Sequence, residues 1–119
     1  MKYLCLGYHD VGALAAMGPH ELKALADERT AYGQVLRKGG HYIGGGALAG
    51  DQTVTTLRFE GGKVFVAEVP LAQARERLGE VMVLEAEDLN RAIQLMSQLS
   101  GMRTGGCLEI RPIDEGLTD

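Results

Sequence analysis

Two helix-forming segments alternate with short extended segments along this chain, and that order leaves few folds open. Apolar residues recur every three or four positions over residues 18–39 and again over 87–100, which is the spacing of one helix face. β-branched and aromatic residues are frequent in the extended segments, as is usual in strands. These segments are residues 2–8, 41–43, 53–59, 64–68, 81–85 and 107–113. The order is that of two strand–helix–strand halves with a hairpin inserted in the first crossover region.

This order fits a ferredoxin-like sandwich of the α+β class, with an antiparallel sheet, helices on one face and an inserted β-hairpin. Residues 60–63 carry two glycines between the hairpin strands, as a tight turn requires. Two long helices cover only one face of such a sheet. The other face would carry apolar residues from every strand, and soluble proteins rarely leave so much apolar surface in water. We therefore expect a homodimer joined through the open sheet face.

The length of 119 residues is that of one domain, which we place at residues 1–113, and we expect residues 114–119 to form a mobile tail. The net charge is -4, and the chain lacks the clustered Lys and Arg that bind nucleic acids or anionic membranes. No apolar run approaches the roughly 20 residues that span a bilayer, and residues 1–6 are too short for a signal peptide. These features predict a cytoplasmic protein without nucleic-acid or membrane partners.

The polar motifs do not predict a metal or a cofactor. Cys5 and Cys107 are the only cysteines, and neither has a CxxC neighbour or a metal-ligand spacing. We expect both to be reduced and buried, as small hydrophobic side chains. The glycines at 44–46 lead into no helix with a following Lys and Ser or Thr, so a bend or a close backbone approach is favoured over a phosphate loop.

One helix carries a charge on its apolar face. Leu22, Leu25, Arg29, Tyr32 and Leu36 all fall on the same side of the helix predicted over residues 18–39. A guanidinium that faces a core needs a partner. In one interpretation the Arg29 side chain extends to the edge of the core or forms a structural ion pair. In the other it holds an anionic ligand in a pocket between helix and sheet.

The histidines are dispersed and form no metal-ligand motif. His9 and Asp10 lie together at the end of the first strand, where sheet-based folds often place chemistry, so both are weak catalytic candidates. His41 flanks the glycines at 44–46 and is a weak candidate for ligand binding. His20 falls in the first turn of the first long helix and is expected to be solvated.

Several motifs spread along the chain match one family. They are Met1-Lys2-Tyr3, Tyr8-His9-Asp10, Leu36-Arg37-Lys38-Gly39-Gly40, Gly44-Gly45, the hairpin, Asp88-Leu89-Asn90-Arg91-Ala92 and Glu109-Ile110-Arg111-Pro112-Ile113. In these features the chain resembles the YCII-related proteins, and within them the branch with the Asp-Gly-Pro-Phe (DGPF) domain. The likeness spans about the whole chain.

The motif that names this branch is altered here. In place of Asp, Gly, Pro and Phe the chain has Glu68, Val69, Pro70 and Leu71. The carboxylate and the proline are retained, but valine adopts a positive φ only with strain. We expect residues 68–79 to form a strand end, a proline turn and a short charged helix.

Glu68 is a weak catalytic candidate because a carboxylate at a strand end before a proline turn is held rigidly. Partial burial would raise its pKa unless a cation lies near, and Arg29 or Arg75 could be that cation. Such a pair either closes the turn onto the first helix or flanks a small anionic or carbonyl ligand, which makes Arg75 a further weak candidate for ligand binding.

The resemblance implies a dimeric α/β-barrel type of assembly with a pocket between helices and sheet or near the dimer junction. Some relatives are proposed to use a histidine and an aspartate as an acid–base pair, by likeness to muconolactone isomerases. Tyr32 occupies the helix position where that histidine is sought, and it is a weak ligand-binding candidate. The DGPF branch is also associated with alternative sigma factors, which implies a regulatory role.

Two functions therefore stay open. In the first, a small homodimer binds a small organic ligand, and any reaction is cofactor-free proton transfer of the isomerase or lyase type. Glu68 or His9 would then move the proton, and Arg29 would hold developing negative charge. In the second, the chain is a non-catalytic regulatory or protein-interaction module.

Overall fold

The computed structural model describes residues 1–49, 54–67, 76–99 and 106–116. Its elements are β1 (Lys2–Asp10), α1 (Val11–Ala15), α2 (Pro19–Lys38), β2 (Tyr42–Ala47), β3 (Thr56–Glu60), β4 (Lys63–Ala67), β5 (Glu76–Glu85), α3 (Leu89–Met96) and β6 (Cys107–Pro112). Four strands form an antiparallel sheet in the order β2-β5-β1-β6, and β3 and β4 form a separate two-stranded sheet.

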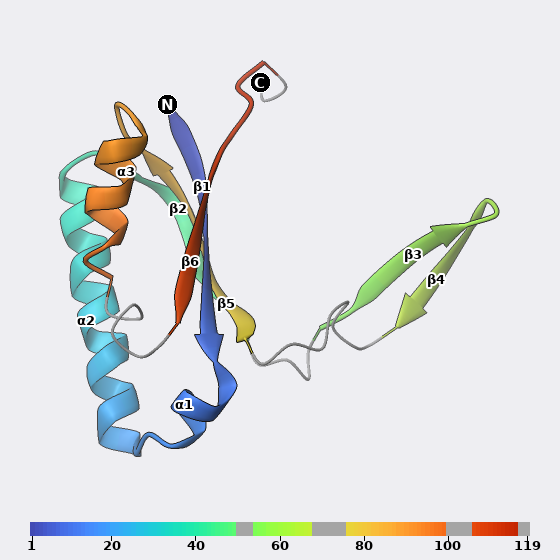
Figure 1. Ribbon diagram of the computed structural model, residues 1–119, viewed down its shortest axis with the longest axis horizontal. Coiled ribbons are helices and arrows are strands. Elements are labelled where there is room, and N and C mark those ends of the chain that lie inside the picture. Colours follow the sequence, from blue (N-terminus) through green and yellow to red (C-terminus); the bar gives the residue numbers. More distant parts are fainter. Residues whose placement is uncertain (50–53, 68–75, 100–105, 117–119) are drawn as a thin grey trace.

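The long helices lie on one side of the four-stranded sheet (Figure 1). Their side of the sheet carries the core, while the other face of the sheet has no helix over it in the described parts of the chain. In chain order the strands of this sheet follow the split strand–helix–strand pattern twice. The expected α+β fold of the ferredoxin-like kind is thus confirmed.

Local signals fix the ends of α2. Pro19 stands at the first helical position, and the Glu21 carboxylate accepts a hydrogen bond of 3.4 Å from the Gly18 N–H. Arg37 and Lys38 occupy the last turn, where cations interact well with the helix dipole. Gly40 follows with a φ of 78°, which ends the helix as expected.

The second long helix, α3, is shorter than its apolar pattern predicts. Asp88 caps its start by accepting a 2.8 Å hydrogen bond from the Arg91 N–H. The helix ends at Met96, and the Ser97 hydroxyl donates to the Ile93 carbonyl over 2.6 Å. Leu99 is buried although it lies beyond the end of the helix, so the helical spacing of apolar residues continues past the last helical residue.

No helix in the parts of the chain that the structure describes is long and apolar enough to cross a membrane.

The core lies between the sheet and the two long helices. Alternate residues of β1 and β5 point into it, because successive side chains of a strand face opposite sides of the sheet. Its buried members are Tyr3, Cys5, Leu36, Met82, Leu84, Ala86, Ala92, Leu95, Met96 and Leu99. Burial raises the pKa of the Cys5 thiol to about 11, which keeps it protonated. The expectation that Cys107 is also buried is wrong, because its side chain is exposed on β6.

The opposite side of the sheet is apolar along its two central strands, β1 and β5, while β6 places Glu109 and Arg111 on this side opposite Leu6 and Leu4. Leu4 pairs with Val83, and Leu6 pairs with Val81, between the residue pairs that point into the core. All four side chains are only partly buried. We call Leu4, Leu6, Val81 and Val83 the open face.

The glycines of β2 permit a close approach rather than ending the strand. β2 continues through Gly44 and Gly45 to Ala47, with an irregularity in its pairing to β5 after Tyr42. Gly45 has a φ of 142°, and a Cβ there would press on the Val81 carbonyl oxygen and lie 2.7 Å from the Met82 Cα. Only glycine fits such a backbone conformation without strain.

The prediction of a short helix within residues 68–79 is wrong for residues 76–79, which belong to strand β5 (Glu76–Glu85). Residues 68–75 lie outside the described residues, but β5 begins at Glu76. Leu78, Arg77 and Glu76 continue the ladder with Tyr8, His9 and Asp10, beyond a bulge in the register. Antiparallel hydrogen bonds to β1 therefore override the helix propensity of these charged residues.

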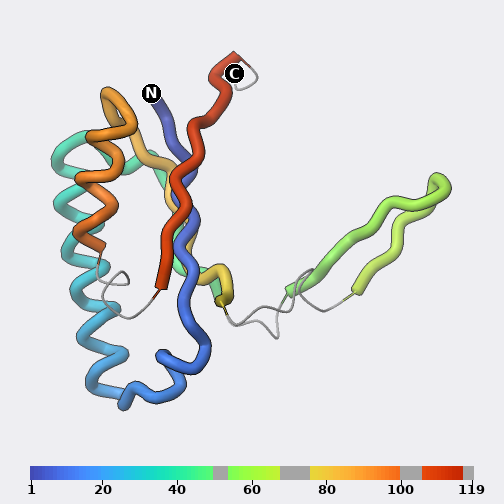
Figure 2. The backbone as a smooth tube through the Cα atoms, viewed as in Figure 1, coloured from blue at the N-terminus to red at the C-terminus, as the bar shows by residue number. Residues whose placement is uncertain are grey.

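The hairpin of β3 and β4 turns at Gly61 and Gly62, whose φ values of 57° and 76° are those that tight hairpins favour. It projects from the sheet on the side away from α2 and α3, as the backbone trace also shows (Figure 2). The Cα radius of gyration is 16.1 Å, above the roughly 13.5 Å of a compact domain of this length. The hairpin is therefore an arm, not a part of the sandwich.

Candidate functional site

A cleft of about 300 Å³ lies between α2 and the ends of β1 and β5 where the strands leave the core. This volume is at the lower end of the range for small-molecule sites. It is lined by Gly7, Tyr8, His9, Leu14, Leu22, Leu25, Ala26, Arg29, Ala47, Leu48, Gly79, Glu80, Leu99, Cys107 and Leu108. Most of this wall is apolar, with a few polar groups placed within it.

Arg29 and Glu80 form an ion pair in the lining of this cleft. Arg29 comes from the apolar stripe of α2 and Glu80 from the helix-facing side of β5, and their Nε and Oε2 atoms are 3.4 Å apart. The side chain of Glu80 is 21% exposed, against 40% for Arg29. Burial raises the pKa of Glu80, and the neighbouring Arg29 acts in the opposite direction. The charge on the apolar stripe of α2 thus has its partner.

The same ion pair borders a second cavity. Arg29, Glu80 and Ala47 line both the cleft and a neighbouring cavity of about 240 Å³. The wall of this cavity also includes Arg37, whose guanidinium lies 4.3 Å from the centroid of the Tyr42 ring. The pair therefore lies between two hollows and can be reached from either.

His9 enters the cleft at a bulge in the sheet. Gly7 pairs with Glu80 and Tyr8 with Leu78, so Gly79 is the extra residue in β5. A Cβ on residue 79 would lie 2.6 Å from His9 Nδ1. The glycine therefore leaves the space that the half-buried imidazole occupies beside Glu80 and the apolar wall.

Asp10, the sequence neighbour of His9, has a local structural contact. Its carboxylate accepts a 3.0 Å hydrogen bond from the Ala13 N–H and caps α1, a short helix that the sequence did not predict. Leu14 of α1 in turn lines the cleft. The structure thus places Asp10 in support of one wall and outside the cleft lining.

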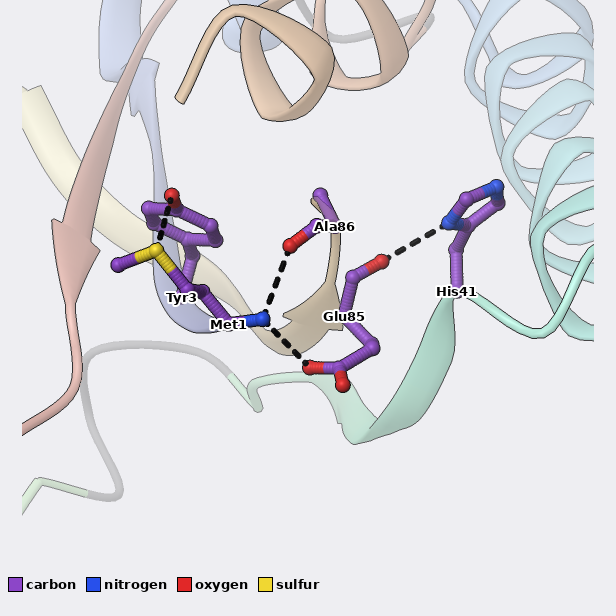
Figure 3. A network of polar contacts seen from close by, with 5 residues as sticks. All are labelled: Met1, Tyr3, His41, Glu85 and Ala86. Carbon is purple, nitrogen blue, oxygen red and sulfur yellow. Dashed lines mark hydrogen bonds and ion pairs between the residues drawn. The ribbon is translucent and has the colours of Figure 1, made fainter. Parts of the chain in front are cut away.

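Tyr32 and His41 also lie away from the cleft lining. The Tyr32 hydroxyl donates a 2.6 Å hydrogen bond to the Leu95 carbonyl and joins α2 to α3. His41 Nδ1 lies 2.8 Å from the Glu85 carbonyl oxygen, near the start of β1 (Figure 3). Their predicted ligand contacts would need a site other than this cleft.

Figure 3 shows how this far end of the sheet is fastened. The Met1 amino group donates to the Ala86 carbonyl over 3.0 Å and lies 3.6 Å from Glu85 Oε2. The Glu85 N–H donates to the His41 carbonyl over 2.7 Å. His41 is therefore part of a structural network that ties β2 to β5.

Of the predicted site residues, the structure brings together His9 and Arg29. Glu68 and Arg75 lie outside the described residues. The carboxylate found beside Arg29 is Glu80, which the sequence reasoning missed by placing it before the strand. The sequence could have indicated this position, because Glu80, Met82 and Leu84 are alternate residues of one strand and therefore face the same side, toward the helices.

The raised pKa of Glu80 gives the site a pH dependence. Because the pKa is higher in the folded than in the unfolded chain, protonation of Glu80 favours folding. This contribution to stability is full below the unfolded pKa and is lost as the pH rises through the folded pKa. In carbon-detected NMR titrations we expect the Glu80 carboxyl to titrate above 4.5, the usual value.

The control for this titration is Glu80→Gln, which should remove that carboxyl resonance and reduce the fall in stability with pH. Glu87→Gln, at an exposed position before α3, should leave both unchanged. A Glu80 midpoint at or below 4.5 would show that Arg29 outweighs burial.

A family model for the YCII-related domain matches residues 1–115 of the chain. Because this match spans nearly all of the chain, the protein belongs to the YCII-related family. A search of curated proteins finds no match.

Proposed function

We propose that this protein is a homodimer that binds a small organic ligand in the cleft at Arg29 and Glu80. The observation that supports this most strongly is the partly buried ion pair within an apolar wall, with His9 lining the same cleft. Apolar pockets with a few convergent polar groups and a perturbed pKa are typical of binding sites. The apolar open face of the sheet supports the dimer.

The lining favours a ligand with an apolar body and one polar end. Leu22, Leu25 and Leu48 line the cleft and would contact the body, while the Arg29 guanidinium would donate hydrogen bonds to a carbonyl or carboxylate. A ligand oxygen near Arg29 would compete with Glu80 for it. Release of Glu80 from the cation would raise the pKa of Glu80 further, because burial alone would then act on it.

Proton transfer without a cofactor is the reaction that this geometry would support. His9 can accept a proton from the carbon next to a carbonyl, and Arg29 can stabilise the enolate oxygen that forms. Glu80, with its raised pKa, is a second group in the cleft that can take up or return a proton.

Phenylpyruvate is a suitable probe, because it joins an aromatic ring to a keto acid and its keto–enol conversion is followed by absorbance. We expect Arg29→Met to weaken its binding about 10- to 100-fold, as loss of a hydrogen bond to a charged group does. Lys23→Met is the matched control, since Lys23 is a cation on the same helix paired to Asp27 and exposed. Calorimetry measures the affinity.

Equal loss of binding in both variants, with the fold intact by circular dichroism, would contradict the proposed site. His9→Gln then separates binding from reaction. If His9 moves the proton, this variant retains affinity and loses acceleration of the keto–enol conversion. Binding by the wild type without any acceleration of the keto–enol conversion would support the second, non-catalytic function described below.

The second function is a non-catalytic regulatory or interaction module, of the kind linked to alternative sigma factors. It is favoured by the ion pair itself, because Arg29 and Glu80 satisfy each other and need no reacting group. This second function also depends on assigning the chain to the DGPF branch, which is associated with alternative sigma factors. That assignment is part of the proposal, because the altered motif at Glu68 to Leu71 lies outside the described residues.

A further inference from the structure

The hairpin of β3 and β4 has one apolar and one mostly polar side. Leu57 pairs with Val66 and Phe59 with Val64, and residues paired across antiparallel strands share a face. The other side carries the pairs Thr56–Ala67, Arg58–Phe65 and Glu60–Lys63. We call Leu57, Phe59, Val64 and Val66 the arm face. These four side chains are 52%, 75%, 52% and 65% exposed, respectively.

So much exposed apolar surface bears on the stability of the hairpin. An isolated two-stranded hairpin is at best marginally stable in water and needs a surface to pack on. The arm projects away from α2 and α3, so the core of its own sandwich does not provide that surface (Figure 1). A covering surface must come from elsewhere.

The open face of the sheet limits what that surface can be. Leu4, Leu6, Val81 and Val83 lie on the side of the sheet toward which the arm projects. A second copy seated on this open face would therefore lie beside the arm. In a twofold dimer each copy would receive the partner's arm as it gives its own.

The surface area that each copy offers is close to what a stable dimer interface needs. The whole side of the sheet that carries the open face has four strands, and over the six residues paired between β1 and β6 its footprint is about 400 Å². A stable interface needs about 800 Å² from each partner. The two five-residue strands of the arm add roughly 165 Å², and the surface under the partner's arm adds as much again. The total comes close to the requirement, which the sheet alone does not meet.

We infer that the β3–β4 hairpin is an exchanged arm, whose arm face packs against a second copy of this chain next to the joined open faces. This inference rests on the homodimer proposed above. It adds that the arm supplies a large share of the interface and that the dimer weakens when the arm face is made polar.

The test compares two phenylalanines on opposite sides of the arm. Phe59 belongs to the arm face and Phe65 to the polar side, and both are exposed. Loss of one aromatic anchor weakens an interface about 30-fold. A twofold dimer contains this anchor twice, so the two factors of about 30 multiply. Phe59→Asp should therefore raise the dimer dissociation constant about 1000-fold in sedimentation equilibrium, while Phe65→Asp should change it less than about threefold.

Three results separate this inference from the dimer itself. A wild-type monomer at tens of micromolar would overturn both. If Leu6→Asp on the open face dissociates the dimer while Phe59→Asp and Phe65→Asp behave alike, the dimer stands and the exchanged arm is overturned. Selective dissociation by Phe59→Asp supports it.

Hydrogen exchange gives a second measurement that needs no substitution. Amides of β3 and β4 should exchange at least 10-fold more slowly above the dimer dissociation constant than below it, because the arm is then packed. Equal exchange at both concentrations would overturn the inference even if Phe59→Asp proved to be unfolded. Amides in the core strand β1 next to Cys5 serve as the reference.

Discussion

Substitution of Gly45 by alanine is expected to destabilise the fold by about 2–6 kcal/mol. A residue other than glycine at a φ of 142° costs about 1–3 kcal/mol, and forcing atoms into packed space costs a similar amount. The added Cβ would meet the backbone of Val81 and Met82, which moves only if β2 separates from β5. Chemical denaturation of the purified variant measures this loss.

The neighbouring glycine is the control. Gly44 has no atom within 4 Å of a Cβ built on it, and its φ is not in the positive range. Gly44→Ala should therefore stay within about 1 kcal/mol of the wild type, since alanine also reduces the freedom of the unfolded chain. Equal stability of the two variants would mean that β2 can move away from β5 without loss.

Substitution of Leu36 by alanine should remove about 2–5 kcal/mol of stability. Leu36 is fully buried where α2 meets the core, and its truncation leaves a cavity that rigid neighbours only partly fill. In a protein whose total stability is about 5–15 kcal/mol, such a loss is readily measured by urea unfolding.

Val35 precedes Leu36 on the same helix and offers the matched comparison. Its side chain is 60% exposed, so Val35→Ala removes little buried surface and favours the helix slightly. Its free energy of unfolding should lie within about 0.5 kcal/mol of the wild type. Should Val35→Ala prove as damaging as Leu36→Ala, the rotation of α2 about its axis would have to be different.

The fold was predictable because its signals are local. The stripe from Leu22 to Leu36 and the glycines after Lys38 set α2, and the glycine pair at 61–62 sets the hairpin. The same local signals failed at Glu76, where pairing with β1 decides the backbone. They also gave no warning of α1, a short helix that depends on the Asp10 cap.

The candidate site was predictable only in part. Arg29 stood out because a cation on an apolar stripe requires a partner, and the structure supplies one. That the partner is Glu80 follows from strand alternation, because Glu80 faces the same side as Met82 and Leu84, but the predicted strand began only at Val81. The position of His9 beside this pair depends on a bulge at Gly79, which no pattern in the sequence announces.

The place of β1 in the sheet also bears on how the chain acquires its shape during synthesis. β1 is made well before both of its neighbours, β5 and β6, because α2, β2 and the hairpin come between them in the chain. Its apolar side chains must wait until these later strands are made, and such non-local pairing slows folding. The nascent chain therefore passes through a vulnerable interval in which a chaperone that holds extended apolar segments would be of most help.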